Sequence, residues 1–266
     1  MFINGNRAQT EVPLRALFFG EGLFETFRYN NRMPIFFDMH YDRMQAGARL
    51  LQIPLIDKES MIELVKKAVI DSGLSDAYVK ICVLSDGSLN YYDIPARGDI
   101  AILIRDYAVR KEPVKASVNS FKRSSESPIR RVKSLNYLEN IVARREADRS
   151  GYNESVFLNE RGEITEATSG NIFWAKNNIL YTPSIGSGIL PGIVRAMLIQ
   201  FIHELGLRTE EGGYQPEHLV GSSFAFLTNS LAGSVLLSQL GGVLFPLNNE
   251  LYEGIKKLLQ TKLGWV

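Results

Sequence analysis

The sequence has little cysteine and no excess of charge of either sign. Cys82 is the only cysteine among 266 residues, which excludes an internal disulfide and a metal site built from several cysteines. Thirty Lys and Arg residues balance 29 Asp and Glu residues, so the formal charge is +1. This balance argues against binding of nucleic acid or an anionic membrane through bulk charge, and we expect neither as a partner.

Long apolar runs are also absent. No run approaches the 18 residues of a transmembrane helix, and the first residues, MFINGNRAQTE, lack the charged and apolar regions of a signal peptide. We therefore predict a cytoplasmic protein. Hydrophobic residues make up 45% and charged residues 22% of the chain, which is typical of a globular protein with one large domain or two modest ones.

The common enzyme motifs are missing as well. The sequence contains no GxxxxGK[ST] phosphate loop, no GxGxxG after a strand, no HExxH and no GxSxG. The three histidines, His40, His203 and His218, are scattered, without a carboxylate or a cysteine at ligand spacing. We therefore predict no metal site.

Apolar periodicity predicts helices and strands in an irregular order. Helical spacing is found at 40–51, after Ser60, and at 135–150, 191–205 and 249–263, and strand patterns at 78–84, 100–104, 155–159, 162–167, 171–176, 179–182 and 224–230. This mixture favours an α+β fold in two parts over a doubly wound parallel sheet.

The stretch 111–128 separates the two parts. It contains two prolines and five serines, with little periodicity apart from a short strand pattern at 116–121. We predict an N-terminal α/β domain at 1–112, an interdomain linker at 113–124 and a C-terminal cofactor-binding domain at 125–266.

Three features in the second half point to one kind of cofactor. Lys133 precedes the helical pattern that starts at 135, Glu166 ends a strand, and Gly192 and Ile193 begin a helix whose free N–H groups favour an anion. A lysine, a carboxylate and a phosphate seat are the groups that pyridoxal phosphate needs. Spacing by itself leaves open that Lys133 is a solvated surface residue and Glu166 a turn residue.

Five segments in the same order give these residues a context. They are FGEGLFETFR at 19–28, HYDRM at 40–44, KSLNYLENIVARREA at 133–147, NESVFLNERGEITEATSGNIF at 153–173 and ILYTPSIGSGILPGIVR at 179–195. With them the chain resembles the class IV aminotransferase family, the fold-type IV pyridoxal phosphate enzymes. The resemblance implies a smaller N-terminal α/β domain, a larger C-terminal domain, a small-molecule substrate and a homodimer, with the cofactor between the domains.

The resemblance also implies roles for individual residues. Lys133 would be the Schiff-base lysine and the proton shuttle, and Glu166 would pair with the pyridine nitrogen of the cofactor. The further cofactor contacts would be Arg43, Ile193, Val194 and Ser230 on the phosphate and Leu190 on the ring face.

The sequence departs from the family pattern in two places. The family commonly has a threonine where this chain has Val194, so a hydroxyl contact to phosphate is missing. Tyr137 is one residue closer to the lysine than the tyrosine that branched-chain enzymes place on the phenolic oxygen of the cofactor.

The family includes branched-chain aminotransferases, D-amino acid aminotransferases and 4-amino-4-deoxychorismate lyases. The spacing of ETFRYNNRMP at 25–34 and the segment LTNSLAG at 227–233 resemble the lyases. We therefore predict a lyase of folate biosynthesis that forms 4-aminobenzoate and pyruvate, with Arg97, Lys122 and Arg123 as candidates to bind substrate carboxylates. The alternatives are a transaminase for branched-chain or D-amino acids, which uses 2-oxoglutarate or pyruvate as acceptor, and a non-catalytic relative that keeps the fold.

Overall fold

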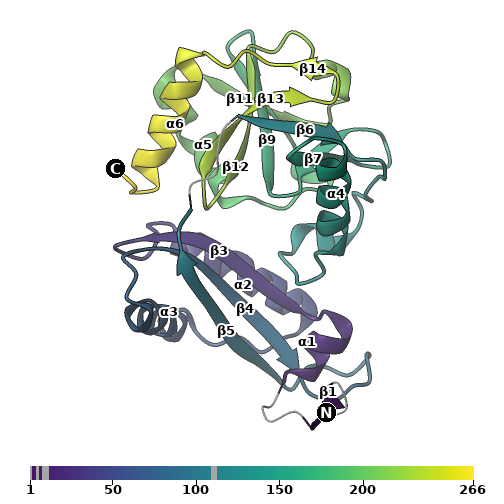
Figure 1. The fold of residues 1–266 in the computed structure, drawn as a ribbon, viewed down its shortest axis with the longest axis vertical. Coiled ribbons are helices and arrows are strands. Elements are labelled where there is room, and N and C mark those ends of the chain that lie inside the picture. Colours follow the sequence, from purple (N-terminus) through teal and green to yellow (C-terminus); the bar gives the residue numbers. More distant parts are fainter. Residues whose placement is uncertain (1, 4–5, 8–11, 109–112) are drawn as a thin grey trace.

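The structure is a computed structural model that describes residues 2–3, 6–7, 12–108 and 113–266. Two main sheets organise the chain, and they come from successive parts of the sequence (Figure 1). The three-stranded sheet lies in the N-terminal part, and the nine-stranded sheet contains every strand after position 113. Mixed helix and strand content in this arrangement confirms the predicted α+β fold.

The smaller sheet is antiparallel, with the order β3 (Gly22–Asn30), β4 (Asp76–Asp86) and β5 (Arg97–Asp106). Alternate residues of β4 are buried, from Ala77 to Val83, against α2 (Phe37–Leu51) and α3 (Lys58–Ser72). Because strand side chains alternate between two faces, Tyr78, Lys80 and Cys82 lie on the other face. The same part contains β1 (Phe2–Ile3), β2 (Asn6–Arg7) and α1 (Leu14–Phe19).

The larger sheet closes on itself. Its strand order is β11-β10-β9-β12-β13-β6-β7-β8, with β14 on β13, and β8 also pairs with β9. The ring of β9, β12, β13, β6, β7 and β8 therefore forms a small barrel filled by side chains such as Val156, Ile172 and Leu227. The bounds are β6 (Val114–Val118), β7 (Glu154–Leu158), β8 (Ile164–Ala167), β9 (Gly170–Lys176), β10 (Ile179–Pro183), β11 (Arg208–Gly212), β12 (Phe224–Asn229), β13 (Gly233–Leu240) and β14 (Val243–Leu244).

Two helices cover the outer face of the barrel beside β9 and β12. Val194 and Leu198 of α5 (Ile193–Phe201) pack with Phe173 and Phe226, and α6 (Glu250–Lys262) adds Ile255 to this second core. The remaining helix, α4 (Leu138–Arg149), packs on β7. Short 3₁₀ turns lie at Pro128–Arg131, Ile185–Ser187, Ile202–Leu205 and Pro216–Leu219. No helix in the described part of the chain is long and apolar enough to span a membrane.

The segment 113–124 is more than a linker. It carries β6, which pairs in parallel with both β13 and β7 inside the larger sheet. The sequence predicts a short strand at 116–121 in this segment; the observed strand begins two residues earlier, at Val114, and its Val114 and Ala116 are buried in the barrel. The predicted end of the first domain at 112 lies outside the described residues, and the division at that point stays a prediction.

The helix predicted at 135–150 begins later, at Leu138. The preceding residues are extended, because Ser134 pairs with Leu23 of β3 and the N–H of Leu135 donates to the carbonyl of Gly22 at 2.9 Å. Tertiary pairing therefore takes these residues away from the helix. It also ties the chain that enters the larger part to the edge of the smaller sheet.

Candidate active site

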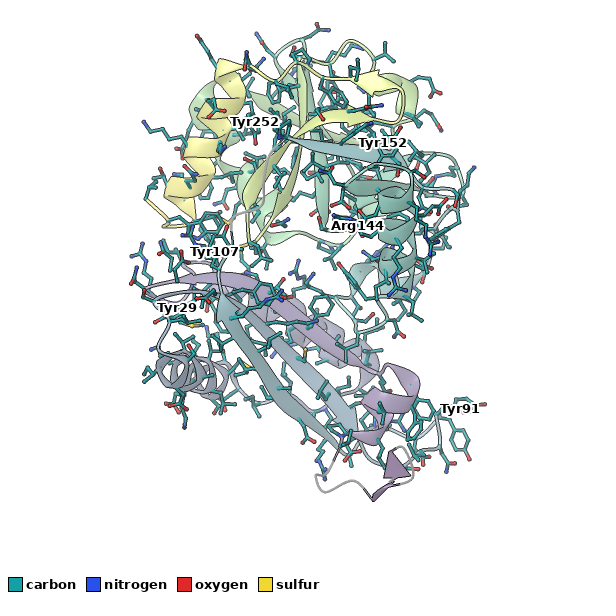
Figure 2. All side chains as sticks on the ribbon, in the orientation of Figure 1. Tyr29, Tyr91, Tyr107, Arg144, Tyr152 and Tyr252 are labelled. Atoms are coloured by element: carbon teal, nitrogen blue, oxygen red, sulfur yellow. The ribbon has the colours of Figure 1, made fainter. Side chains whose placement is uncertain are left out.

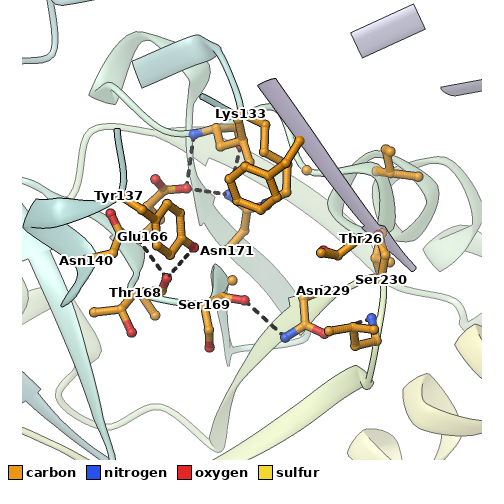
Figure 3. A pocket seen from close by; sticks show the side chains of 18 of the residues that line it. Thr26, Lys133, Tyr137, Asn140, Glu166, Thr168, Ser169, Asn171, Asn229 and Ser230 are labelled. Atoms are coloured by element: carbon orange, nitrogen blue, oxygen red, sulfur yellow. Dashed lines mark hydrogen bonds between the residues drawn. The ribbon is translucent and has the colours of Figure 1, made fainter. Parts of the chain in front are cut away.

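A cavity of about 530 Å³ lies between the smaller sheet and the mouth of the barrel, within the size range of small-molecule sites. β3 and β4 line one side of it, and the chain around 128–141, 166–171, 190–194 and 228–232 lines the rest. All seven site residues predicted from the sequence line this one cavity, some of them seen in Figure 3: Arg43, Lys133, Glu166, Leu190, Ile193, Val194 and Ser230. Their chemical roles remain predictions.

The backbone of Lys133 is fixed by the smaller sheet. The N–H of Phe24 donates to the carbonyl of Lys133 at 2.8 Å, next to the Leu23–Ser134 pairing. The lysine side chain thus extends into the cavity from a strand-like segment anchored by hydrogen bonds. Its Nζ lies 4.4 Å from the centroid of the Phe24 ring.

The surroundings of Lys133 lower the pKa of its side-chain amine. Burial, reinforced by the positive charge of Arg43, lowers the pKa of Lys133 from 10.5 to about 8. A lysine with this pKa has a substantial neutral fraction near neutral pH, and only the neutral amine can act as a nucleophile or a base.

Glu166 is held by backbone and side-chain donors. Its Oε2 accepts the N–H of Leu190 at 3.0 Å and lies 3.4 Å from Nδ2 of Asn171, while Nη1 of Arg123 lies 3.6 Å from Oε1. Burial raises the pKa of Glu166, and the positive charge of Arg123 opposes this rise. A cationic ring nitrogen placed beside the carboxylate would favour its ionised form further.

Arg43 is oriented by a buried carboxylate. Nε and Nη2 donate to the two oxygens of Glu25, each at 2.7 Å, and Nη1 donates to the carbonyl of Pro191 at 2.8 Å. His40 Nδ1 lies 2.7 Å from the same carboxylate. Although burial opposes ionisation, Arg43 and His40 lower the pKa of Glu25 to about 2, so Glu25 is an ionised carboxylate whose two oxygens orient the guanidinium.

The first turn of α5 faces the cavity without a side-chain cap. Gly192 is the N-cap residue of this helix, and none of the described side chains accepts a hydrogen bond from the N–H groups of its first turn. A Cβ at position 192 would collide with Oδ1 of Asn171, whose Nδ2 donates to the carbonyl of Leu190 at 3.0 Å. The close packing that only glycine permits brings the free N–H groups of Ile193 and Val194 to the cavity, where they can bind an anion.

Tyr137 also lines the cavity, but its hydroxyl has a protein partner. It donates to the carbonyl of Thr168 at 3.0 Å, and Asn140 donates to the same carbonyl at 2.8 Å (Figure 3). Burial, with the charges of Glu166 and Glu154, raises the pKa of Tyr137 to about 12. The hydroxyl therefore stays protonated, and its hydrogen bond to Thr168 stabilises the turn after Glu166.

The cations predicted to meet substrate carboxylates are only partly in place. Arg97 lies outside the cavity in ion pairs with Asp86 and Asp99, and Lys122 is exposed and is not among the cavity residues. Arg123 does line the cavity, but it is buried over the ring of Phe157 and paired with Glu139 at 2.9 Å. The charge of Arg123 therefore acts on Glu166 and Glu139 within the protein.

Sequence reasoning missed Lys80, which lines the cavity from β4. Its Nζ lies 4.4 Å from the Phe24 centroid, as Lys133 Nζ does, so the two amines are no more than twice that distance apart. Among the described residues Lys80 has no carboxylate within ion-pair distance. The sequence feature that could have identified Lys80 is the alternation of the strand YVKICVL at 78–84, which puts this lysine on the face of the sheet opposite the core.

Comparisons with known proteins agree over most of the chain. A family model described as "Amino-transferase class IV" matches residues 22–239. The "Aminodeoxychorismate lyase" of Bacillus subtilis is 28% identical over 87% of this chain and 83% of that protein. A "Putative branched-chain-amino-acid aminotransferase" of Methanocaldococcus jannaschii is 29% identical over 98% and 92%. A solved structure described as a "Putative 4-amino-4-deoxychorismate lyase" from Legionella pneumophila is similar with a TM-score of 0.89, at 32% identity over 93% of each chain.

Proposed function

The chain belongs to the class IV aminotransferase family, and on this premise we propose that it is a lyase that converts 4-amino-4-deoxychorismate into 4-aminobenzoate and pyruvate. The family depends on pyridoxal 5'-phosphate, as the resemblance read from the sequence implies. The observation that carries the enzyme class is the convergence of Lys133, Glu166, Arg43 and the uncapped start of α5 in one cavity.

The donors and acceptors of the cavity suit pyridoxal phosphate. Arg43 and the N–H groups of Ile193 and Val194 are donors for the phosphate, and the Glu166 carboxylate is an acceptor for a protonated ring nitrogen. We assign Leu190 to the ring face and Ser230 to the phosphate, because both line the same cavity. Bound there, the cofactor supplies an electron sink for the bond that breaks at the amine-bearing carbon of the substrate.

Lys133 carries out the proton transfers. As a neutral amine it takes the proton from the substrate carbon that bears the amine, and as an ammonium it returns this proton to the departing three-carbon unit. The carbon–oxygen bond of the enolpyruvyl ether breaks, pyruvate leaves, and the ring becomes aromatic. Atoms balance without water or an oxidant, and the Lys133 amine lies 4.4 Å from the centroid of the Phe24 ring.

Lys80 is the cation we assign to a substrate carboxylate. Its Nζ lies 4.4 Å from the centroid of the Phe24 ring, the same distance as the reactive amine of Lys133, and it has no carboxylate of the described residues as an ion-pair partner. 4-Amino-4-deoxychorismate carries two carboxylates, so a free ammonium in the cavity favours it. Among the other predicted cations, only Arg123 lines the cavity, and it is engaged with Glu139.

Two further properties belong to this proposal: a homodimer and a cytoplasmic location. The apolar patch formed by Leu17, Phe18, Tyr91, Tyr92 and Ile94 supports the dimer, since each of these side chains is more than half exposed. α1 and the β4–β5 loop that carry the patch are joined, because Arg15 donates to the carbonyls of Ser88 and Asn90. Figure 2 shows Tyr91 at this end of the molecule, directed away from the chain.

A transaminase is the second candidate, because the similarity to the Methanocaldococcus protein is as high as that to the Bacillus lyase. The test incubates the holoenzyme with 4-amino-4-deoxychorismate in the absence of any keto acid. We expect equal amounts of 4-aminobenzoate and pyruvate, and a loss of about 10³-fold or more in kcat for Lys133→Ala.

Two results would contradict the lyase. One is turnover only when branched-chain or D-amino acids are supplied with 2-oxoglutarate or pyruvate, which would establish the transaminase. The other is a colourless protein without a visible cofactor band, unchanged by borohydride, which would point to a non-catalytic relative.

A further inference from the structure

We propose that the Thr228 hydroxyl binds the phosphate group of the cofactor and replaces the hydroxyl that this chain lacks at position 194. The inference rests on the proposed use of pyridoxal phosphate. It concerns a residue to which neither the sequence motifs nor the resemblance gives a role.

The position of Thr228 in β12 directs its side chain toward α5. Side chains alternate along this strand, with Ala225 and Leu227 in the barrel core and Phe224 and Phe226 in the core that α5 covers. Thr228 continues the second series at the end of the strand. It lines the cavity together with Ile193 and Val194, the first residues of α5.

The Thr228 hydroxyl is buried, and it is unpaired among the residues that the structure describes. The residue is 2% exposed, and no described group accepts or donates a hydrogen bond at its Oγ1. Three other threonines are buried in the described part of the chain, and each of their hydroxyls has a protein oxygen as partner: Thr165, Thr168 and Thr182. A buried unpaired hydroxyl destabilises a fold, so an external partner at Thr228 is the simplest way to satisfy it.

The surrounding groups determine what that partner is. The first turn of α5 offers N–H donors without a side-chain cap, and Arg43 lines the same cavity as a fixed cation. Several donors that face one space fit an acceptor with several oxygens and negative charge, which is a phosphate. The hydroxyl of Thr228 then adds a neutral donor beside the helix end, where Val194 has only methyl groups.

The experiment measures the affinity of the apoprotein for pyridoxal 5'-phosphate and, separately, for pyridoxal, which lacks the phosphate. We expect Thr228→Val to weaken phosphate-ester binding about tenfold, as for a hydrogen bond to a charged group, and to leave pyridoxal binding unchanged. Thr228→Ser should keep wild-type affinity for both. Val194→Thr in the Thr228→Val background should restore most of the loss, because it returns a hydroxyl to the same end of the cavity.

The matched control is Thr209→Val on β11, a partly exposed residue outside the cavity whose hydroxyl is also shielded from solvent and has no partner among the described residues. It should leave both affinities unchanged. If Thr228→Val does not fold, Thr228→Ala replaces it as the variant without a hydroxyl, and the thermal midpoint of each apoprotein checks folding.

Wild-type affinity in both hydroxyl-free variants would overturn the proposal. An equal loss for pyridoxal and its phosphate ester would also overturn it, since the effect would then lie at the ring or in the fold. A wild-type protein that binds neither compound would contradict the proposed function itself, and this outcome is distinct from the other two.

Discussion

At Lys133 the cavity changes an ordinary side chain into a reactive one. The lysine extends from a segment that hydrogen bonds to β3, so the backbone has little freedom to withdraw the amine. Burial and Arg43 lower its pKa to about 8, while the Glu25 carboxylate limits the effect of Arg43 by pairing with it. The buried Glu25 carboxylate thus both orients Arg43 and limits the lowering of the Lys133 pKa.

The lowered pKa predicts the pH dependence of cofactor capture. Only neutral Lys133 can attack the cofactor aldehyde, and a lowered pKa means that this form is populated above pH 8 and lost as the pH falls below it. We expect the rate constant for reconstitution of the apoprotein to rise with pH to a plateau, with a midpoint near 8. Stopped-flow absorbance of pyridoxal phosphate between pH 6 and pH 11 measures it.

Lys80→Met provides a check on the cause. Lys80 contributes to the lowering of the Lys133 pKa through its like charge, so the midpoint should move upward in this variant. A wild-type midpoint at the ordinary lysine value of about 10.4 would contradict the assigned environment.

At the scale of elements, the helices that matter most for the site are held by packing and by their ends. Among the described residues α5 has no side-chain cap, and it presents its first turn to the cavity. α6, in contrast, is capped by Asn249, whose Oδ1 accepts the N–H groups of Leu251 and Tyr252. The two helix ends therefore have different roles. The uncapped N-terminus of α5 leaves N–H groups free to bind a ligand, whereas the capped N-terminus of α6 stabilises the fold.

Removal of the α6 cap should therefore cost stability without touching the site. We expect Asn249→Ala to lower the free energy of unfolding by about 1 kcal/mol, as measured by urea denaturation of the holoenzyme. The neighbouring exposed residue gives the control, Asn248→Ala, which should change it by less than about 0.5 kcal/mol. Equal effects of the two variants would show that the cap bonds do not stabilise α6.

At the scale of the whole molecule, the cavity exists because two separately built parts meet. The smaller part supplies Phe24 and Lys80 from its sheet and Arg43 from α2, and the larger part supplies Glu166 and the start of α5. The apolar patch on α1 and the β4–β5 loop lies in the smaller part, and it does not belong to the cavity.

The patch predicts how the protein assembles. Charged residues within it should prevent association, because a dimer that buries Phe18 and Tyr91 would have to desolvate the new charges. We expect sedimentation equilibrium to give a dimer for the wild type and a monomer for Phe18→Glu combined with Tyr91→Glu. Ile70→Glu, at a side chain of α3 that is 77% exposed, is the control and should leave the wild-type mass. A double variant that remains dimeric would place the interface elsewhere.

Much of the local structure follows from the sequence. Regular apolar spacing predicts α2, β4, β9 and α6 with ends within a few residues, because each buries one face in a core and its pattern records that face. The strands β3, β11 and β13 were not predicted. β11 is half exposed at a sheet edge, and its residues carry too few apolar side chains to form a pattern.

The sequence by itself determined the chemistry of the protein. Residues with distinctive side chains in an ordered set of segments name the family, the cofactor and the seven residues expected at the site, all of which line one cavity. The chemical type of each side chain and its order along the chain are properties of the sequence itself, so they can be read without the fold.

Tertiary structure alone decided which neighbours those residues have. It placed the amines of Lys80 and Lys133 against the same Phe24 ring, kept Arg97 and Lys122 out of the cavity, made β6 part of the barrel and left the Thr228 hydroxyl without a partner among the described residues. Each of these outcomes depends on contacts between residues tens of positions apart. Such contacts are selected by packing and by hydrogen-bond satisfaction across the whole fold, which no local pattern contains.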